Sequence, residues 1–196
     1  TPGWTCHLAQ CERVLIDGVG ANYSRPTMIQ ELRRRGVRAE AFLSPALPWR
    51  LAYANLRNHR KVLVVDGALG FTGGMNVRAG CLADGDPENA IADLHFAIEG
   101  PVVAELLESF AEDWAFSTDE RLAGDAWYPP LEPRGEVLAR AVPDGPDEHL
   151  DKLRWTLLGA IATARRRVGI VTPYFLPDSG LQSALSVAAL RGVQVD

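Results

Sequence analysis

The sequence has no long hydrophobic run and no excess of basic residues. No stretch approaches the ~20 apolar residues that a membrane-spanning helix needs, and residues 1–4 lack the features of a secretory signal peptide. Lysine and arginine total 20 against 25 acidic residues, for a net charge of −5. Because nucleic-acid binders gain most of their affinity by neutralising phosphates, this balance disfavours that class of protein. We therefore expect a water-soluble segment without a nucleic-acid partner.

Cysteine is scarce. Cys6, Cys11 and Cys81 are odd in number, and the C-x4-C spacing of the first two matches no zinc-binding pattern. We interpret them as small buried or incidental thiols, which fit a reducing compartment. The sequence contains no other cluster of metal ligands, so we expect neither a metal nor another cofactor.

The sequence does contain enough apolar residues for one ordinary core, since 47% of its 196 residues are hydrophobic. Apolar runs and turn signals predict strands over 14–18, 37–43, 58–65, 69–72, 94–98, 168–172 and from 193 onward. Periodicity and caps predict helices over 27–35, from Gly100-Pro101 onward, over 150–167 and over 178–191. Val103, Leu106, Leu107, Phe110 and Trp114 should form the core-facing stripe of the second of these. Alternating strands and helices predict an α/β fold with a mixed sheet.

A proline-rich connector over residues 117–149 separates two parts, 1–116 and 150–196. The two parts share a faint echo, Leu-Arg-Arg-Arg-Gly-Val at 32–37 and Leu-Arg-Gly-Val at 190–193. Such a helix ending is common, and alone it is weak evidence for a repeat. Because the chain starts without Met and stops inside a predicted strand, we expect it to be a fragment.

The segment 58–66, Asn-His-Arg-Lys-Val-Leu-Val-Val-Asp, carries the most informative pattern. On a strand, His59 and Lys61 share one face about 7 Å apart, so both can touch one phosphate. Asp66 has the opposite parity and lies at the turn, where an organising role is favoured. A His and a Lys on a strand are more often just a solvated face, but a second pattern, Gly-Gly-Met-Asn at 73–76, favours function.

A two-residue Asp66-Gly67 turn would pair Val65 with Ala68, Lys61 with Thr72 and His59 with Gly74. In that register the glycines leave room for a ligand beside the histidine. Asn76 follows just beyond and can donate its amide to a phosphate oxygen. A nucleophile, a cation, an amide donor and open space would then converge.

His59-x-Lys61-x4-Asp66 with Gly73-Gly74-x-Asn76 resembles the HKD motif of the phospholipase D superfamily. Segments at 58–61, 71–76, 93–96, 100–103, 110–114 and 172–178 narrow the resemblance to bacterial cardiolipin synthases, and it spans residues 14 to 196. The resemblance implies a phospholipase D-like α-β-α sandwich with one repeat largely present and a second only begun. It also implies two His-Lys pairs, whereas His7, His95 and His149 lack a lysine at +2. The catalytic site of this chain should be half complete.

By this resemblance, His59 attacks phosphorus to form a phosphohistidine, Lys61 and Asn76 stabilise the phosphate oxygens, and Gly73 and Gly74 flank the phosphate. A second histidine, missing here, protonates the leaving alcohol. A carboxylate would hold the His59 tautomer; Asp93 is the candidate, Asp66 the fallback, and a plain loop carboxylate the alternative for Asp93. Tyr174 either lines the pocket or belongs to the core.

The leading function is therefore phosphatidyl transfer between phospholipids of the phosphatidylglycerol type. The alternatives are a phospholipase D-like hydrolase, a single-motif dimeric nuclease and a non-catalytic fragment that binds phosphate or lipid. The parent protein should be associated with the bacterial cell membrane. Arg33–Arg35 and Arg165–Arg167 either meet its anionic surface or are simply solvated helix ends.

Overall fold

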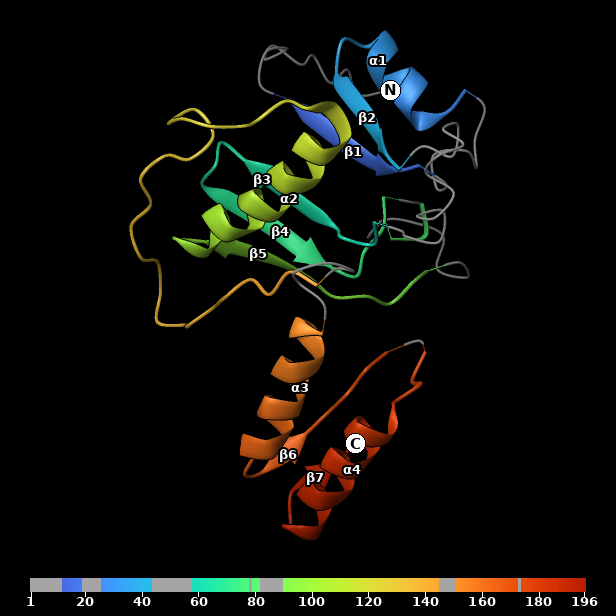
Figure 1. Cartoon of the computed structure of the whole chain (residues 1–196), viewed down its shortest axis with the longest axis vertical. Helices are drawn as coiled ribbons and strands as arrows, with labels where there is room; N and C mark the ends of the chain where they lie inside the picture. The colour runs from blue at the N-terminus through green and yellow to red at the C-terminus, as the bar shows by residue number, and fades with distance from the viewer. Residues whose placement is uncertain are drawn as a thin grey trace. The chain divides into compact units, whose positions relative to one another are not determined.

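The computed structural model describes residues 12–18, 26–43, 58–77, 79–81, 90–144, 151–172 and 174–196. Cysteines 6 and 11 and histidines 7 and 149 lie outside these residues. The chain divides into two compact units, residues 1–140 and 141–196, and the division falls within the predicted connector (Figure 1). Each unit is described by itself.

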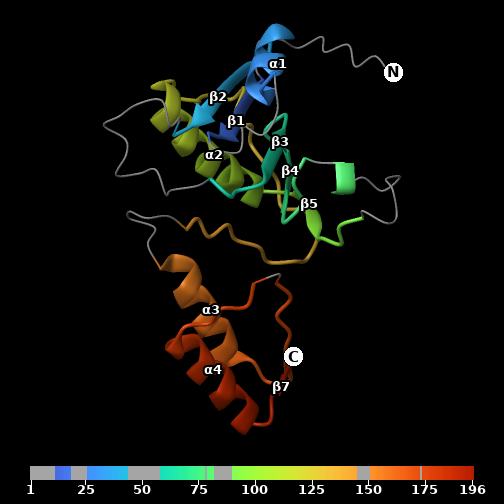
Figure 2. The same ribbon diagram turned by 90° about the vertical axis from the view of Figure 1, so that its right-hand side faces the viewer.

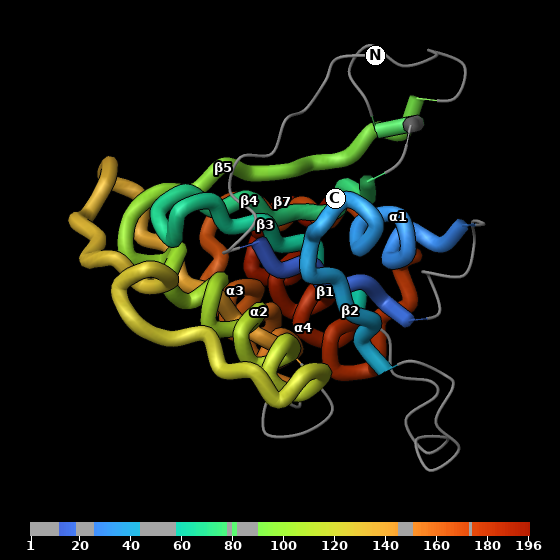
Figure 3. The backbone as a smooth tube through the Cα atoms, turned by 90° about the horizontal axis from the view of Figure 1, so that it is seen from above, coloured from blue at the N-terminus to red at the C-terminus, as the bar shows by residue number. Residues whose placement is uncertain are grey.

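The first unit begins with a parallel strand pair joined by a helix. β1 (Arg13–Asp17) pairs with β2 (Arg38–Phe42), and α1 (Met28–Arg34) lies between them in sequence. Thr27 caps α1 in a capping box with Gln30, which satisfies two backbone N–H groups that the first turn leaves free. In Figure 3, α1 lies beside β2. These three elements agree with the sequence prediction.

A three-stranded antiparallel sheet follows, in the order β3 (Val62–Val65), β4 (Leu69–Gly73), β5 (His95–Glu99). A 3-10 turn, Ala79–Cys81, lies between β4 and β5 in the chain. β3 is shorter than predicted, because residues 58–61 form no ladder with β4.

Helix α2 (Val102–Thr118) packs against β2, β3, β4 and β5, and Figure 2 shows it on one side of the three-stranded sheet. Gly70 allows this close approach, because a Cβ atom there would lie 2.9 Å from Leu106 Cδ1. The predicted stripe is confirmed: Phe110 stacks on Trp114 at 6.0 Å, and four of its members are buried, namely Val103, Leu106, Leu107 and Trp114.

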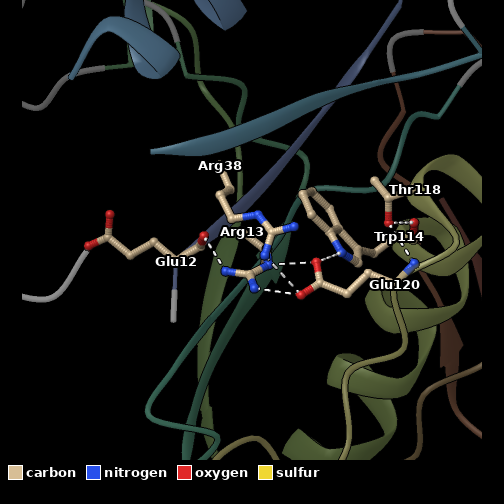
Figure 4. Close-up of polar contacts among 6 residues, drawn as sticks. All are labelled: Glu12, Arg13, Arg38, Trp114, Thr118 and Glu120. Atoms are coloured by element: carbon tan, nitrogen blue, oxygen red, sulfur yellow. Dashed lines mark hydrogen bonds and ion pairs between the residues drawn. The ribbon is translucent and has the colours of Figure 1, made fainter. Parts of the chain in front are cut away.

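A charged cluster ties β1 and β2 to the end of α2 (Figure 4). Glu120 accepts two hydrogen bonds from Arg13, at 2.9 and 2.6 Å, one from Trp114 Nε1 at 2.9 Å and one from Arg38 at 3.1 Å. The Arg13 guanidinium also lies 5.8 Å from the ring centroid of Trp114 and 5.6 Å from that of Trp127. Paired charge and cation–π contacts offset the cost of burying Arg13.

The second unit contains α3 (Lys152–Thr163), β6 (Arg167–Val168), α4 (Ser179–Leu190) and β7 (Gln194–Val195), around a core of Ile161, Ala188 and Val193. The predicted helix over 150–167 was too long. Ala164 takes an extended conformation with ψ 135 and ends α3, so that Arg167 enters β6. The predicted strand over 168–172 was also too long, because β6 ends at Val168.

The two units repeat one β-α-β pattern. Each helix begins eleven residues after its preceding strand ends, from Asp17 to Met28 and from Val168 to Ser179. Both helices end with the same pair of backbone bonds and a left-handed glycine, Gly36 at φ 86 and Gly192 at φ 85. Both units then pair their strands in parallel, β1 with β2 and β6 with β7. The faint sequence echo therefore marks a repeated supersecondary unit.

These elements confirm the α/β fold class. The strands form three small sheets, two parallel and one antiparallel, in the described part of the chain. No helix there is long and apolar enough to cross a bilayer.

Candidate active site

His59 and Lys61 lie on the segment that leads into β3. The imidazole of His59 is exposed, and Lys61 Nζ donates a hydrogen bond to the backbone carbonyl of His59 at 2.7 Å. The ammonium group therefore lies against the histidine residue itself. The structure brings these two predicted residues together at the edge of the sheet.

The residues that alternate with them are fixed to α2. Asn58 Nδ2 donates to Asp113 Oδ2 at 2.7 Å, and Arg60 Nη1 donates to the same oxygen at 2.5 Å. Asn58 Oδ1 also accepts from the backbone N–H of Arg60 at 3.1 Å. Asn58 and Arg60 thus face α2, and His59 between them is exposed.

The predicted hairpin register is wrong by one residue. Val65 pairs with Leu69 and Val62 with Thr72, because three residues, 66–68, form the connection instead of two. Asp66 and Gly67 both have positive φ, 53 and 63, and the N–H of Ala68 bonds to the carbonyl of Val65. Thr72 is therefore the partner of Val62 and not of Lys61, which lies outside the ladder.

The paired glycines are crowded by β5 and the segment before it. A Cβ atom on Gly73 would lie 2.8 Å from His95 Nδ1, and one on Gly74 would lie 2.8 Å from Asp93 Oδ2. The backbone N–H of Gly74 bonds to the carbonyl of Leu94 at 3.0 Å. The glycines therefore let segment 93–95 close over the end of β4.

The other predicted residues are more dispersed. Asp93 is exposed and caps the N–H of Leu94 at 2.7 Å. Asn76 is exposed beyond β4. Asp66 lies at the hairpin turn, after the end of β3, and its organising role stays a prediction. Tyr174 belongs to the second unit and is 82% exposed, so it is not a core tyrosine within that unit.

Sequence reasoning missed two residues of this site. Asp113 carries no local signal, since its partners lie 53 and 55 residues earlier in the chain. His95 was set aside because it lacks a lysine at +2; its Nδ1 is buried and has no hydrogen-bond partner among the described residues. Pairing of β5 with Gly73 puts His95 beside the candidate site.

Neighbouring carboxylates partly neutralise the basic cluster at the end of α1. Arg34 and Arg35 both pair with Glu31, and Arg33 pairs with Glu40. The hydrogen bonds from Arg34 and Arg35 lower the pKa of Glu31 to about 2. In the described residues, no group of three or more His, Cys, Asp and Glu side chains could hold a metal ion.

No protein-family model matches the chain. The chain is 41% identical over 182 residues to cardiolipin synthase A of Pseudomonas putida, covering 93% of this chain and 37% of the relative. Cardiolipin synthase A of Pseudomonas fluorescens is 38% identical over 187 residues, with 93% and 38% covered. Cardiolipin synthase of Geobacillus thermodenitrificans is 34% identical over 185 residues, with 93% and 37% covered.

The chain thus spans less than two fifths of the length of these curated relatives. The aligned part covers 93% of its residues, so the likeness is not confined to one short motif. Over most of its length, the chain is homologous to a segment of the bacterial cardiolipin synthases.

Proposed function

We propose that this chain supplies half of the active site of a phosphatidyltransferase that joins two phospholipids. The observation that carries the proposal is the placement of His59 and Lys61. Asn58 and Arg60 are bonded to α2, which leaves the histidine exposed with an ammonium group against its backbone. A nucleophile beside a cation suits attack on an anionic phosphodiester.

In the proposed reaction, a ring nitrogen of His59 attacks the phosphorus of a phosphatidylglycerol-type lipid. The N–P bond forms as the P–O bond to the head group breaks, and the head group leaves as an alcohol. Lys61 and Asn76 stabilise the non-bridging oxygens. The hydroxyl of a second phospholipid then displaces His59, and its proton passes to a general base.

The leaving alcohol needs a proton donor. None of the other histidines, His7, His95 and His149, has a lysine two residues later. We assign this role to a histidine of a second His-Lys pair, outside residues 1–196. Since its substrates are lipids, the full-length protein would act at a membrane surface.

Replacing Lys61 tests the proposal, and the other lysine of the chain, Lys152, provides a control. Lys61→Met in the full-length protein should lower kcat for lipid transfer by about 10²-fold or more, since it removes a cation from the transition state. Lys152→Met, in the second unit, is the matched control and should leave kcat unchanged. Equal activities of the two variants would contradict the role of Lys61.

His59→Ala tests the covalent step. With phosphate-labelled lipid, the wild-type protein should yield an acid-labile phosphoenzyme and His59→Ala should yield none. Product analysis separates the alternatives: a joined phospholipid and a released head group indicate transfer, whereas phosphatidic acid indicates hydrolysis. A phosphoenzyme that persists in His59→Ala would remove His59 as the nucleophile.

A further inference from the structure

Asp113 on α2 is the only described side chain bonded to both neighbours of His59. One of its oxygens, Oδ2, accepts hydrogen bonds from Asn58 Nδ2 and from Arg60 Nη1. The Asp113 side chain is 15% exposed and that of Arg60 is 28% exposed, so water screens the pair only in part. The contact joins residues more than fifty positions apart.

The three residues form a closed network. Asn58 uses both ends of its amide, with Nδ2 on Asp113 and Oδ1 on the backbone N–H of Arg60. This fixes the amide orientation and the backbone on both sides of residue 59. The carbonyl of His59 in turn receives Lys61 Nζ at 2.7 Å. The positions of the histidine and the ammonium group therefore depend on one carboxylate.

The support behind Asp113 is rigid. The carboxylate lies on a helix whose neighbouring residues Ser109 and Trp114 are buried, and Trp114 bonds to Glu120. Charge-assisted hydrogen bonds of this kind are about twice as strong as neutral ones and are strongly directional. Residues 58–61, in contrast, form no strand pairing of their own.

We propose that Asp113 is a positioning residue that holds His59 and Lys61 in the geometry of phosphoryl attack through Asn58 and Arg60. The inference rests on the proposed function. In this proposal Asp113 acts only through Asn58 and Arg60, so its loss should impair the reaction and leave lipid binding largely intact. A misplacement of about 1 Å at the reacting atoms can cost about 10²-fold in rate.

The test uses Asp113→Ala, Asp113→Asn and the control Glu108→Gln in the full-length protein. Glu108 is an exposed carboxylate on the same helix, so its variant removes the same charge away from residues 58–60. Asp113→Ala should lower kcat about 10²-fold with little change in KM. Asp113→Asn keeps an oxygen acceptor and nearly the same volume, so it should fold normally and lose less activity. Glu108→Gln should match the wild type.

Two further readouts separate positioning from a merely structural role. Hydrogen–deuterium exchange should rise over residues 58–61 in Asp113→Ala, with the rest of α2 unchanged. Arg60→Ala combined with Asp113→Ala should lose no more activity than the worse single variant, because both remove the same anchor. Wild-type kcat in both Asp113 variants, or unchanged exchange over 58–61, would overturn the proposal. If the wild type itself transfers no lipid, the proposed function fails, and the exchange measurement still decides whether Asp113 anchors the segment.

Discussion

At the scale of single residues, Gly74 shows how tightly the end of β4 is closed. Asp93 lies over it, with Oδ2 2.8 Å and Cγ 2.9 Å from the place of a Cβ atom, and Asp93 also caps the N–H of Leu94. A methyl group here has to displace the carboxylate. Asp93 can thus take this position because Gly74 has no side chain.

Gly74→Ala should therefore lower the free energy of unfolding by about 1 kcal/mol, because the displaced Asp93 loses its bond to the Leu94 N–H, although this exposed carboxylate can move aside. Urea denaturation gives the value. Gly169→Ala is the matched control, because Gly169 also has no positive φ and has no atom within 4 Å of the added Cβ. It should change stability by about 0.5 kcal/mol or less. Equal effects at the two positions would contradict the crowding by Asp93.

The alternation that places His59 and Lys61 on one face is a local property of a strand, but β3 begins only at Val62, so their spacing stays a prediction. The hairpin register could not be predicted from sequence. The register depends on a third connecting residue. The connection also lies against a distant part of the chain, since a Cβ on Gly67 would be 2.5 Å from Pro129 Cδ. Asp113 could not be predicted either, because its contacts are also distant in sequence. No pattern near Asn58 or Arg60 indicates which carboxylate they bond to.

At the scale of elements, the Glu120 cluster links the C-terminal end of α2 to the β1–β2 pair through Arg13, Arg38 and Trp114. Hydrogen bonds from Arg13, chiefly, and from Trp114 hold the pKa of the Glu120 carboxyl at about 2, below its usual 4.5. A depressed pKa means that ionised Glu120 stabilises the fold. This stabilisation is complete above about pH 4.5 and is lost as the pH falls towards 2.

Glu120→Gln should remove this dependence. The difference in unfolding free energy between wild type and variant should be largest near pH 6 and shrink as the pH falls from 4.5 towards 2. Glu31, whose pKa is also lowered to about 2, is present in both proteins and cancels in the difference. Glu108→Gln serves as the control. A constant difference across this pH range would refute the assignment to Glu120.

The ends of helices α1 and α4 were easier to predict than the strand register, because the residues that signal a helix end lie next to it in the chain. Asp178 caps α4, and Gly36 and Gly192 follow the ends of α1 and α4, as the sequence indicates, whereas Thr27, predicted as the first helical residue, is the cap of α1. Helix α3 was predicted too long, because residues 164–167 carry no proline or glycine to end it. There the chain leaves the helix to pair β6 with β7, a tertiary requirement.

At the scale of the whole chain, the two compact units are joined by a stretch that is open to proteases. Residues 132–140 are all exposed and belong to no helix or strand. Exposed connectors of this kind are the usual sites of proteolytic nicking. The covalent link should therefore be cut before either unit is.

Brief trypsin treatment should cut the described part of the chain first after Arg134 or Arg140, leaving each unit intact. Mass spectrometry of the early fragments identifies the cut. Initial cleavage within α2, α3 or α4 would contradict the division into units at residue 140.

The bond between Arg13 and Glu120 also bears on how the first unit folds. It spans 107 positions of the chain, so its loop must close before the contact contributes any energy. Local structure such as the β3–β4 hairpin and α2 can form earlier. We therefore expect the cluster to form late in folding, so that its loss should speed unfolding more than it slows folding.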